Sequence, residues 1–200
     1  MGLLLDAWLT VLTALWLMLP AYLANMLPVL VGGGAPIDGG RNWKDGQRML
    51  GDGKTWRGLL LAPVLAVLLV GVLRWTTTFP AWGRYGFSDY GPSPWWVLLA
   101  YAMALGALVG DALESFFKRR TGRVRGERWV PFDQLDFVAG GLLFVALVST
   151  VLALVGATAS NYFLDAFTWP RLLVIVLLTP ALHLVVNLIG YKIGAKDVPW

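Results

Sequence analysis

PWWVLLAYAMALGALVGDALESFF, residues 94–117, is the stretch that determines the fold of this chain, because no charged residue stands between Pro94 and Gly110. A helix needs about 20 apolar residues to cross the roughly 30 Å hydrocarbon core of a bilayer. Four further stretches are apolar over a similar length: residues 7–31, 58–75, 137–159 and 169–191. Their continuous apolar character argues against a β-barrel, in which apolar and polar residues alternate. The sequence therefore predicts an all-α integral membrane protein with five transmembrane helices, in one domain over residues 1–200.

The composition supports a membrane protein and excludes several kinds of catalytic site. Of the 200 residues, 58% are hydrophobic and only 14% are charged, whereas a soluble domain carries about 25% charged residues. The chain contains no Cys, which excludes disulfides, thiolate nucleophiles, iron–sulfur clusters and Cys-ligated zinc. Because His183 is its single His, an HExxH zinc site is also excluded. A bound metal would therefore have oxygen ligands, which favours Mg²⁺ or a similar hard cation.

Two basic segments orient the predicted helices. Residues 32–57 and 118–136 together hold 11 of the 16 Lys and Arg residues, five in the first segment and six in the second. The positive-inside rule places both segments in the cytoplasm. Five spans then leave the N-terminus and the segment 76–93 outside and the C-terminus in the cytoplasm. We expect a multi-pass protein of the cell membrane whose active site faces the cytoplasm.

The first cytoplasmic loop is rich in glycine as well as in charge. Glycines leave backbone N–H groups open to an anion, and Lys and Arg supply positive charge, so the loop suits a polyphosphate. The segment Gly51-Asp-Gly-Lys54-Thr55 is not a Walker A motif, because Arg48 stands where that motif requires its first Gly. The alternative is a positive-inside loop with ordinary turns.

Acidic residues gather on both sides of the second loop. Four polar residues share one face of the third predicted helix, at positions i, i+3, i+4 and i+7: Asp111, Glu114, Ser115 and Lys118. Asp133 and Asp136 stand three residues apart just before the fourth span. Ionisable groups near the end of a span are costly and indicate function. Their convergence predicts phosphoryl or nucleotidyl transfer, with carboxylates on one or two Mg²⁺ ions. Interhelical salt bridges are the alternative.

His183 and Asn187 stand four residues apart on the fifth predicted helix. They could contact a lipid headgroup or a metal ion. Polar side chains of membrane helices also form hydrogen bonds between helices. We expect a buried interhelical hydrogen bond at this position.

The acidic region resembles a known signature. Gly110-Asp111-Ala-Leu-Glu114-Ser115-Phe-Phe-Lys118-Arg119, followed by Asp133-Gln-Leu-Asp136, is similar to the G-D-x-x-E-S-x-x-K-R and D-R-x-D pattern of the CTP:phosphatidate cytidylyltransferases. Gln134 replaces the Arg of that pattern, and its Lys-Asp and Pro-Gly-His-Gly-Gly elements are missing. The whole chain resembles the archaeal branch, the CDP-archaeol synthases, which share the first-loop pattern Gly32-Gly-Gly-x-Pro36-Ile-Asp38, Asp45-Gly and Gly51-Asp-Gly-Lys54-Thr55-x-Arg57-Gly58.

This resemblance implies an enzyme of archaeal phospholipid biosynthesis. It would transfer a cytidylyl group from CTP to an isoprenoid glycerol phosphate lipid, 2,3-bis-O-geranylgeranylglycerol 1-phosphate, and release pyrophosphate. The implied cofactor is Mg²⁺. The implied partners are CTP, this lipid and the membrane bilayer, and no nucleic acid.

With the resemblance, roles can be assigned to eleven residues. The expected catalytic residues lie in the acidic region: Asp111, Glu114, Lys118, Asp133 and Asp136. Within this set, three carboxylates are the expected Mg²⁺ ligands: Asp111, Asp133 and Asp136. Glu114 is a further ligand or orients one. The residues expected to bind the nucleotide or the lipid phosphate are Asp38, Lys54, Thr55, Arg57, Ser115 and Arg119.

Two other functions are alternatives. A CDP-alcohol phosphotransferase also uses Asp clusters at the membrane interface, but the DGxxAR and GxxxDxxxD elements of its motif are absent from this sequence. A membrane ion or solute transporter also carries intramembrane carboxylates, although transporters tend to place them near the midplane on broken helices. CTP-dependent release of pyrophosphate would separate the enzyme from the transporter.

Overall fold

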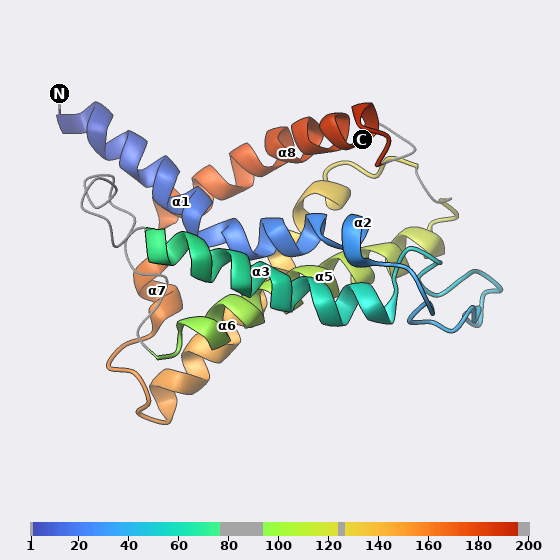
Figure 1. Ribbon diagram of the computed structural model, residues 1–200, viewed down its shortest axis with the longest axis horizontal. Helices are drawn as coiled ribbons and strands as arrows, with labels where there is room; N and C mark the ends of the chain where they lie inside the picture. Colours follow the sequence, from blue (N-terminus) through green and yellow to red (C-terminus); the bar gives the residue numbers. More distant parts are fainter. Residues whose placement is uncertain (1, 77–93, 124–126, 196–200) are drawn as a thin grey trace.

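The long apolar runs form the helices of a bundle (Figure 1). The computed structural model describes residues 2–76, 94–123 and 127–195. The helices in these ranges are α1 (Gly2–Met26), α2 (Pro28–Val31), α3 (Trp56–Thr76), α5 (Trp96–Arg120), α6 (Phe132–Leu154), α7 (Tyr162–Ala166) and α8 (Trp169–Lys192). Strand pairing in the same ranges is limited to two isolated bridges, Pro36 with Thr55 and Asn42 with Arg48.

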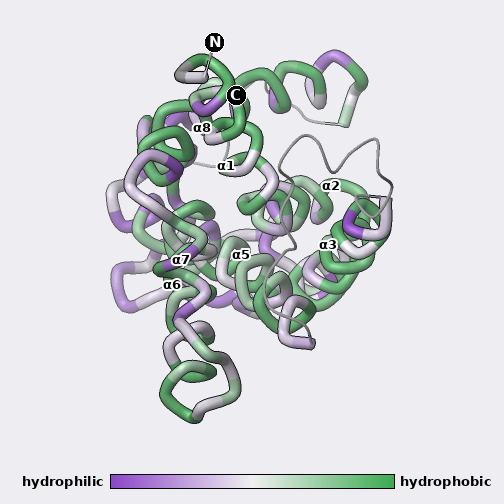
Figure 2. The backbone as a smooth tube through the Cα atoms, turned by 90° about the vertical axis from the view of Figure 1, so that its left-hand side faces the viewer, coloured by the Kyte–Doolittle hydropathy of each residue, from purple (hydrophilic) through white to green (hydrophobic). Residues whose placement is uncertain are grey.

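Within the described ranges, five helical segments are long and apolar enough to cross a membrane: Leu4–Val31, which joins α1 and α2, and the helices α3, α5, α6 and α8. Hydrophobic residues run along these helices, and hydrophilic residues gather in the connections and at helix ends (Figure 2). Many large apolar side chains are exposed, such as Leu61, Leu147 and Leu177. A bilayer would cover these side chains. The predicted all-α fold with five spans is confirmed, whereas the orientation of the spans stays a prediction.

Helix α5 lies at the centre of the bundle and packs against α1, α3 and α6. Its buried face is built largely of small residues, with Met103 and Leu99 filling the centre. The closest packing is with α6, where Gly106 and Gly110 face Gly140. Small residues allow membrane helices to approach until their backbones touch. This contact also determines how the acidic residues of the two helices lie.

The structure corrects the position of the fourth span. We expected residues 137–159, but α6 begins at Phe132 and ends at Leu154. Gly156 has a φ of +71°, a left-handed conformation that ends helices. At the other end, Pro131 precedes the helix and Asp133 lies in its first turn, where the helix dipole favours a carboxylate. Asp133 and Asp136 therefore project from the first turns of a helix, rather than from a loop before it.

Other span boundaries differ as well. The first apolar segment starts at Gly2 rather than residue 7, and it is interrupted before Pro28, which begins the separate short helix α2. Helix α5 runs to Arg120 rather than residue 117, since three basic residues in its last turn suit the negative end of the helix dipole. The expected outer segment 76–93 lies, apart from Thr76, outside the described residues.

Candidate active site

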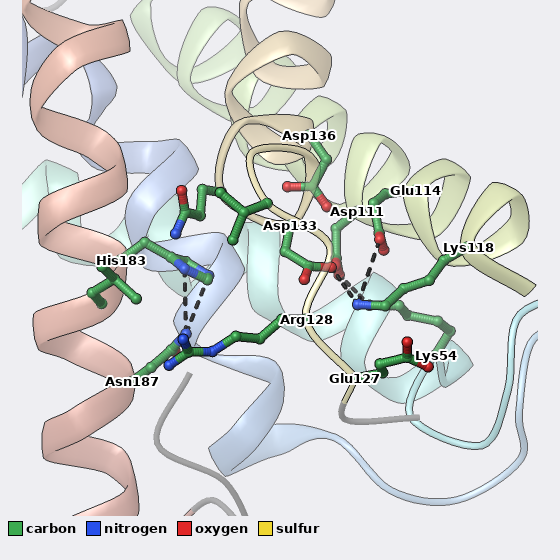
Figure 3. Close-up of a pocket in the computed structure, with 13 residues that line it drawn as sticks. Lys54, Asp111, Glu114, Lys118, Glu127, Arg128, Asp133, Asp136, His183 and Asn187 are labelled. Carbon is green, nitrogen blue, oxygen red and sulfur yellow. Dashed lines mark hydrogen bonds and ion pairs between the residues drawn. The ribbon is translucent and has the colours of Figure 1, made fainter. Parts of the chain in front are cut away.

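A pocket lies where the last turns of α5 and α8 meet the first turns of α6 (Figure 3). One end of the molecule gathers these turns together with the glycine-rich segment 32–55, which we call loop 1 (Figure 1). The pocket contains five carboxyl groups and three basic side chains. Its lining residues are Lys54, Asp111, Glu114, Lys118, Glu127, Arg128, Val130, Asp133, Gln134, Asp136, His183, Leu184 and Asn187.

Three of the carboxyl groups meet inside the pocket. Asp111 and Glu114 project from one face of α5, and Asp136 projects from α6 (Figure 3). One oxygen atom of each lies within 4.8 Å of the others. Glu114 is buried, with 8% of its surface exposed. Carboxylate oxygens gathered in this way are the donors that a hard divalent cation prefers.

Backbone contact between α5 and α6 explains why these carboxyl groups are close together. A Cβ atom on Gly110 would lie 2.3 Å from the carbonyl oxygen of Asp136. A Cβ atom on Gly140 would lie 2.2 Å from the carbonyl oxygen of Gly106. No side chain fits at either place, so the glycines hold the two helices at minimal separation. Asp111, which follows Gly110, is thereby placed beside Asp136.

Two lysines hold the carboxyl groups from the side of loop 1 and from α5 itself. Lys54 Nζ, at the end of loop 1, donates to Asp111 Oδ2 over 2.5 Å. Lys118 Nζ forms an ion pair with Asp133 and lies 3.7 Å from Glu114 Oε1. Lys118 is 9% exposed, so its charge is compensated by carboxylates rather than by bulk water. Basic groups thus alternate with acidic ones across the pocket.

Helix α8 supplies the opposite wall. The side-chain amide nitrogen of Asn187 lies 3.3 Å from His183 Nδ1, and the His183 ring stacks on Phe137 with centroids 6.2 Å apart. Asn187 is buried, and both polar side chains line the pocket (Figure 3). This contact joins two residues of the same helix, and the expected hydrogen bond between helices stays a prediction. The i, i+4 spacing of the pair is what brings the two side chains together.

Loop 1 is organised around a buried carboxylate. Asp38, whose side chain is fully buried, accepts hydrogen bonds from the backbone N–H groups of Gly40, Leu50 and Gly51. The guanidinium of Arg48 adds an ion pair at 3.0 Å. Burial alone would raise the pKa of the Asp38 carboxyl, but these donors outweigh it and hold the pKa well below its usual range. Asp38 is therefore an ionised acceptor that holds several segments of loop 1 together.

The end of loop 1 is joined to α3 by a helix cap. Thr55 immediately precedes α3, is buried, and accepts a hydrogen bond from the Gly58 N–H at 3.2 Å. This is the position and contact of an N-cap residue. A Cβ atom on Gly58 would lie 3.2 Å from the Thr55 hydroxyl and 3.5 Å from Pro28, so α2 packs closely on this cap. Lys54 is thus anchored on one side by a capped helix.

Comparison with known proteins shows the family of this chain. The model of one protein family, described as CarS-like CDP-archaeol synthase, matches residues 7–200. The chain belongs to the CDP-archaeol synthase family. It is 46% identical over 187 residues to the CDP-archaeol synthase of Methanosphaerula palustris, covering 92% of this chain and all of the relative. It is 43% identical to that of Natronomonas pharaonis, covering 96% of this chain and 98% of the relative.

A solved structure has the same fold. It is described as an intramembrane enzyme for archaeal membrane lipids biosynthesis, and it superposes with a TM-score of 0.64 at 37% sequence identity. The match covers 88% of this chain and 94% of the other. The family resemblance seen in the sequence is therefore confirmed, and this chain is a multi-pass membrane enzyme of the CDP-archaeol synthase family.

Six of the residues predicted from the sequence meet in the pocket of this family member: Lys54, Asp111, Glu114, Lys118, Asp133 and Asp136. They come from loop 1 and from the helices α5 and α6. In the described residues, the carboxylate oxygens that lie close enough together to hold a metal ion belong to Asp111, Glu114 and Asp136. The Asp133 carboxylate contacts Lys118, the backbone N–H of Trp129 and the Glu114 side chain. The expected role of Asp133 as a metal ligand stays a prediction.

Three predicted ligands in and after loop 1 lie outside the pocket. Asp38 holds loop 1 and Thr55 caps α3 through the contacts described above, and their expected contact with phosphate stays a prediction. Arg57 lies in the first turn of α3 and is exposed. Sequence alone suggested phosphate ligands because turn-forming and phosphate-binding loops share the same residue types.

Two predicted ligands on α5 also lie outside the pocket. Ser115 is buried, and its hydroxyl lies 3.5 Å from Glu114 Oε2, so it contacts one of the acidic side chains without lining the pocket. Arg119 donates to the carbonyl oxygen of Arg123 at 2.9 Å and reaches toward Gly51 of loop 1. Both residues support the site rather than line it.

Seven pocket residues were not among the predicted site residues: Glu127, Arg128, Val130, Gln134, His183, Leu184 and Asn187. Of these, His183 and Asn187 were expected to form a buried hydrogen bond. Gln134 is 6% exposed and stands between Asp133 and Asp136 in the sequence. Its place between two acidic residues was visible in the sequence, whereas its burial was not. Glu127, Arg128 and Val130 belong to a charged loop, in which nothing in the sequence distinguishes pocket residues from residues facing solvent.

Proposed function

We propose that this chain transfers a cytidylyl group from CTP to the phosphate of 2,3-bis-O-geranylgeranylglycerol 1-phosphate and releases pyrophosphate. The observation that carries the proposal is the group of Asp111, Glu114 and Asp136, flanked by Lys54 and Lys118, at one end of membrane helices in a CDP-archaeol synthase family member. Family membership favours this reaction over the transporter and the phosphotransferase.

The reaction needs no nucleophile from the protein. An oxygen of the lipid phosphate attacks the α-phosphorus of CTP, a new P–O bond forms, and the bond from the α-phosphorus to the bridging oxygen of the pyrophosphate breaks. The attacking phosphate monoester is already an anion, so no strong general base is required. This agrees with a chain that has no Cys and a single His. Catalysis then consists of positioning the reactants and stabilising negative charge.

The pocket's own residues divide these tasks. Lys54 and Lys118 carry ammonium groups at two sides of the acidic group, and Arg128 adds a guanidinium to the wall of the pocket. In our proposal they bind phosphate oxygens of CTP and of the lipid, as basic groups do in phosphate sites. Asp133 orients Lys118 through their ion pair.

Mg²⁺ fits this donor set. Asp111, Glu114 and Asp136 would hold the ion, because they offer three carboxylate oxygens and no nitrogen or sulfur. When bound, the ion would stabilise negative charge on phosphate oxygens during the transfer. We further propose that the pocket faces the cytoplasm, where CTP is available, because residues 32–57 and 118–136 carry 11 of the 16 Lys and Arg residues.

The test is a transfer assay with the purified protein in detergent. Radiolabelled CTP, Mg²⁺ and geranylgeranylated glycerol phosphate are incubated with the wild type, and lipid-soluble label and pyrophosphate are measured together. We expect both products in equal amounts, and we expect Asp136→Asn to lose them. Asp6→Asn is the matched control, since it removes the same charge from an exposed residue near the other end of the bundle.

The same assay separates the alternatives. Label transferred equally well to ester-linked diacylglycerol phosphate would overturn the lipid assignment. A folded protein that forms no CDP-lipid from any lipid phosphate would overturn the reaction. Loss of product on removing Mg²⁺ with a chelator, and recovery on adding it back, is expected if the three carboxylates hold the ion.

A further inference from the structure

The last turn of α5 carries a residue that joins loop 1 to the helix. The Arg120 guanidinium approaches Asp45 Oδ2 at 2.6 Å and donates to the carbonyl oxygens of Arg48 at 2.6 Å and Gln47 at 3.2 Å. It also lies over the ring of Phe116, 4.5 Å from the centroid. The Arg120 side chain thus contacts Asp45, Gln47 and Arg48, which belong to one turn of loop 1. Its side chain is only 17% exposed.

Aromatic packing supports the same attachment. The Trp43 ring, in loop 1, meets the Phe116 ring edge to face at 5.3 Å. Phe116 is therefore held between Trp43 and the Arg120 guanidinium. A guanidinium over an aromatic face adds to the attraction of its ion pair. The turn 43–48 is fastened to α5 by charge, hydrogen bonds and ring contact together.

From this turn a continuous chain of contacts leads to Lys54. Arg48 binds the carboxylates of Asp38 and Asp52, and Asp38 in turn holds the backbone of Leu50 and Gly51. The Lys54 N–H then donates to the carbonyl oxygen of Gly51 at 3.2 Å. Contacts within loop 1 thus connect the turn that Arg120 binds to Lys54, which donates to Asp111.

Both ends of this chain of contacts are attached to α5. Asp111 receives Lys54, and Arg120 holds the turn, nine residues further along the same helix. Arg120 itself is not among the residues that line the pocket. Beyond its own helix, its printed contacts are with loop 1, so we expect its influence on the site to pass through that loop.

We propose that Arg120 is a positioning residue for the nucleotide: it fixes loop 1 against α5 so that Lys54 is held at the pocket. This inference rests on the proposed function, in which Lys54 binds phosphate. An Arg suits the task better than a Lys, because its planar fork can serve a carboxylate and two carbonyl oxygens at once while it stacks on a ring.

A double-mutant cycle tests whether Arg120 acts through Lys54. The Kd for CTP in the presence of Mg²⁺ is measured by equilibrium dialysis for the wild type, Arg120→Ala, Lys54→Ala and the double variant. We expect Arg120→Ala to raise the Kd by about tenfold or more. When Arg120→Ala is combined with Lys54→Ala, we expect it to raise the Kd by less than about a further twofold, because the effects of substitutions at coupled residues are not additive. An equal tenfold effect in both backgrounds would overturn the inference.

Two further variants identify the contact itself. We expect Arg120→Lys to recover only part of the affinity, and Asp45→Ala to weaken CTP binding in the same direction as Arg120→Ala. Lys44→Ala is the matched control, since it removes one positive charge from an exposed neighbour of Asp45. A Kd raised as much by Lys44→Ala as by Arg120→Ala would reduce the effect to net charge and overturn the inference.

A distance measurement without nucleotide separates the docking of loop 1 from the reaction. The chain has no Cys, so Gly53→Cys and Leu113→Cys can carry two spin labels at exposed sites. We expect one narrow distance distribution in this protein, a broad one after Arg120→Ala, and no broadening after Lys44→Ala. Failure of the parent protein to bind CTP would overturn the proposed function. Intact CTP binding with distances unchanged by Arg120→Ala would overturn this inference alone.

Discussion

Replacing Gly140 with Ala should separate α5 from α6 and disrupt the acidic group. The new Cβ atom would lie 2.2 Å from the carbonyl oxygen of Gly106 and 2.8 Å from the Gly110 Cα, whereas real Cβ contacts almost never fall below 3.0 Å. Both neighbours are backbone atoms, so no rotamer change can relieve the clash. Going from 2.2 Å to 3.0 Å requires the helices to separate by about 0.8 Å at this level.

The separation reaches the site because of where the acids stand. Asp136 precedes Gly140 by one helical turn, and Asp111 follows Gly110, so the two carboxyl groups move apart with the backbones. A misplacement of roughly 1 Å in a catalytic arrangement costs about 100-fold in rate. We therefore expect transfer to fall by about 100-fold. Overpacking costs about 1–3 kcal/mol of stability, of which the better helix propensity of Ala recovers about 0.5–1 kcal/mol.

The assay compares the CTP-dependent transfer rate at saturating Mg²⁺ with the temperature of half-inactivation in the same detergent. Gly71→Ala is the control, because its Cβ would meet only the tip of the Trp96 ring at 3.1 Å, away from the pocket. We expect that variant to keep its rate. A near wild-type rate for Gly140→Ala would refute the reasoning. Equal losses in both variants would also refute it, since packing in general would then be responsible.

Three shorter predictions follow from the site and loop 1. We expect Asp136→Asn to weaken the binding of Mn²⁺, measured by EPR of the free ion, by at least about tenfold. We expect Asp133→Asn to weaken it less, since the Asp133 carboxylate is already paired with Lys118. Equal losses in the two variants would indicate that Asp133 is also a metal ligand. We expect Thr55→Val to cost about 1 kcal/mol of stability and to leave the KM for CTP unchanged, and we expect Thr55→Ser to restore the stability. A raised KM for CTP at unchanged stability would instead indicate a contact between Thr55 and the nucleotide. Because hydrogen bonds hold the pKa of Asp38 below its ordinary value of 3.8, its stabilisation of loop 1 is complete above that pH and is lost as the pH falls below it. The mobility of a spin label at Gly53→Cys should therefore differ between the wild type and Asp38→Asn by a constant amount from pH 8 to 5. This difference should become smaller only below about pH 4. A rise in label mobility in the wild type near pH 6 would contradict the prediction.

The fold was largely predictable because membrane spans depend on local composition. Each span is a continuous apolar run, and the number of runs matches the number of membrane-length helices in the described residues. The fourth boundary was wrong because hydropathy alone continued the helix through Val155 and Ala157. The left-handed turn at Gly156 ends it instead, and Phe132 and Leu135 extend it at the other end. Helix ends depend on single residues with special backbone geometry, which an average over a window does not detect.

The candidate site was predictable where spacing on one helix determines proximity. Asp111, Glu114 and Lys118 share a face of α5, as the periodicity requires. The roles of loop residues were harder to predict. Asp38 and Thr55 have the side chains of phosphate ligands, but their oxygens accept hydrogen bonds from the backbone of the same region. Which acceptor a loop carboxylate finds depends on the path of the chain, and the sequence pattern is the same in both cases.

By itself the sequence determined the class of protein, the five helical spans, the family and the residue types of the site. These follow from composition, local periodicity and motif spacing, all of which act between residues close together in the chain. Only the tertiary structure decided which carboxyl groups meet, since Glu114 joins Asp111 and Asp136 while Asp133 pairs with Lys118. It also decided that Arg120 holds loop 1. Both outcomes depend on how closely α5 and α6 pack and on how a loop folds back onto a helix, and these are contacts between segments far apart in the chain.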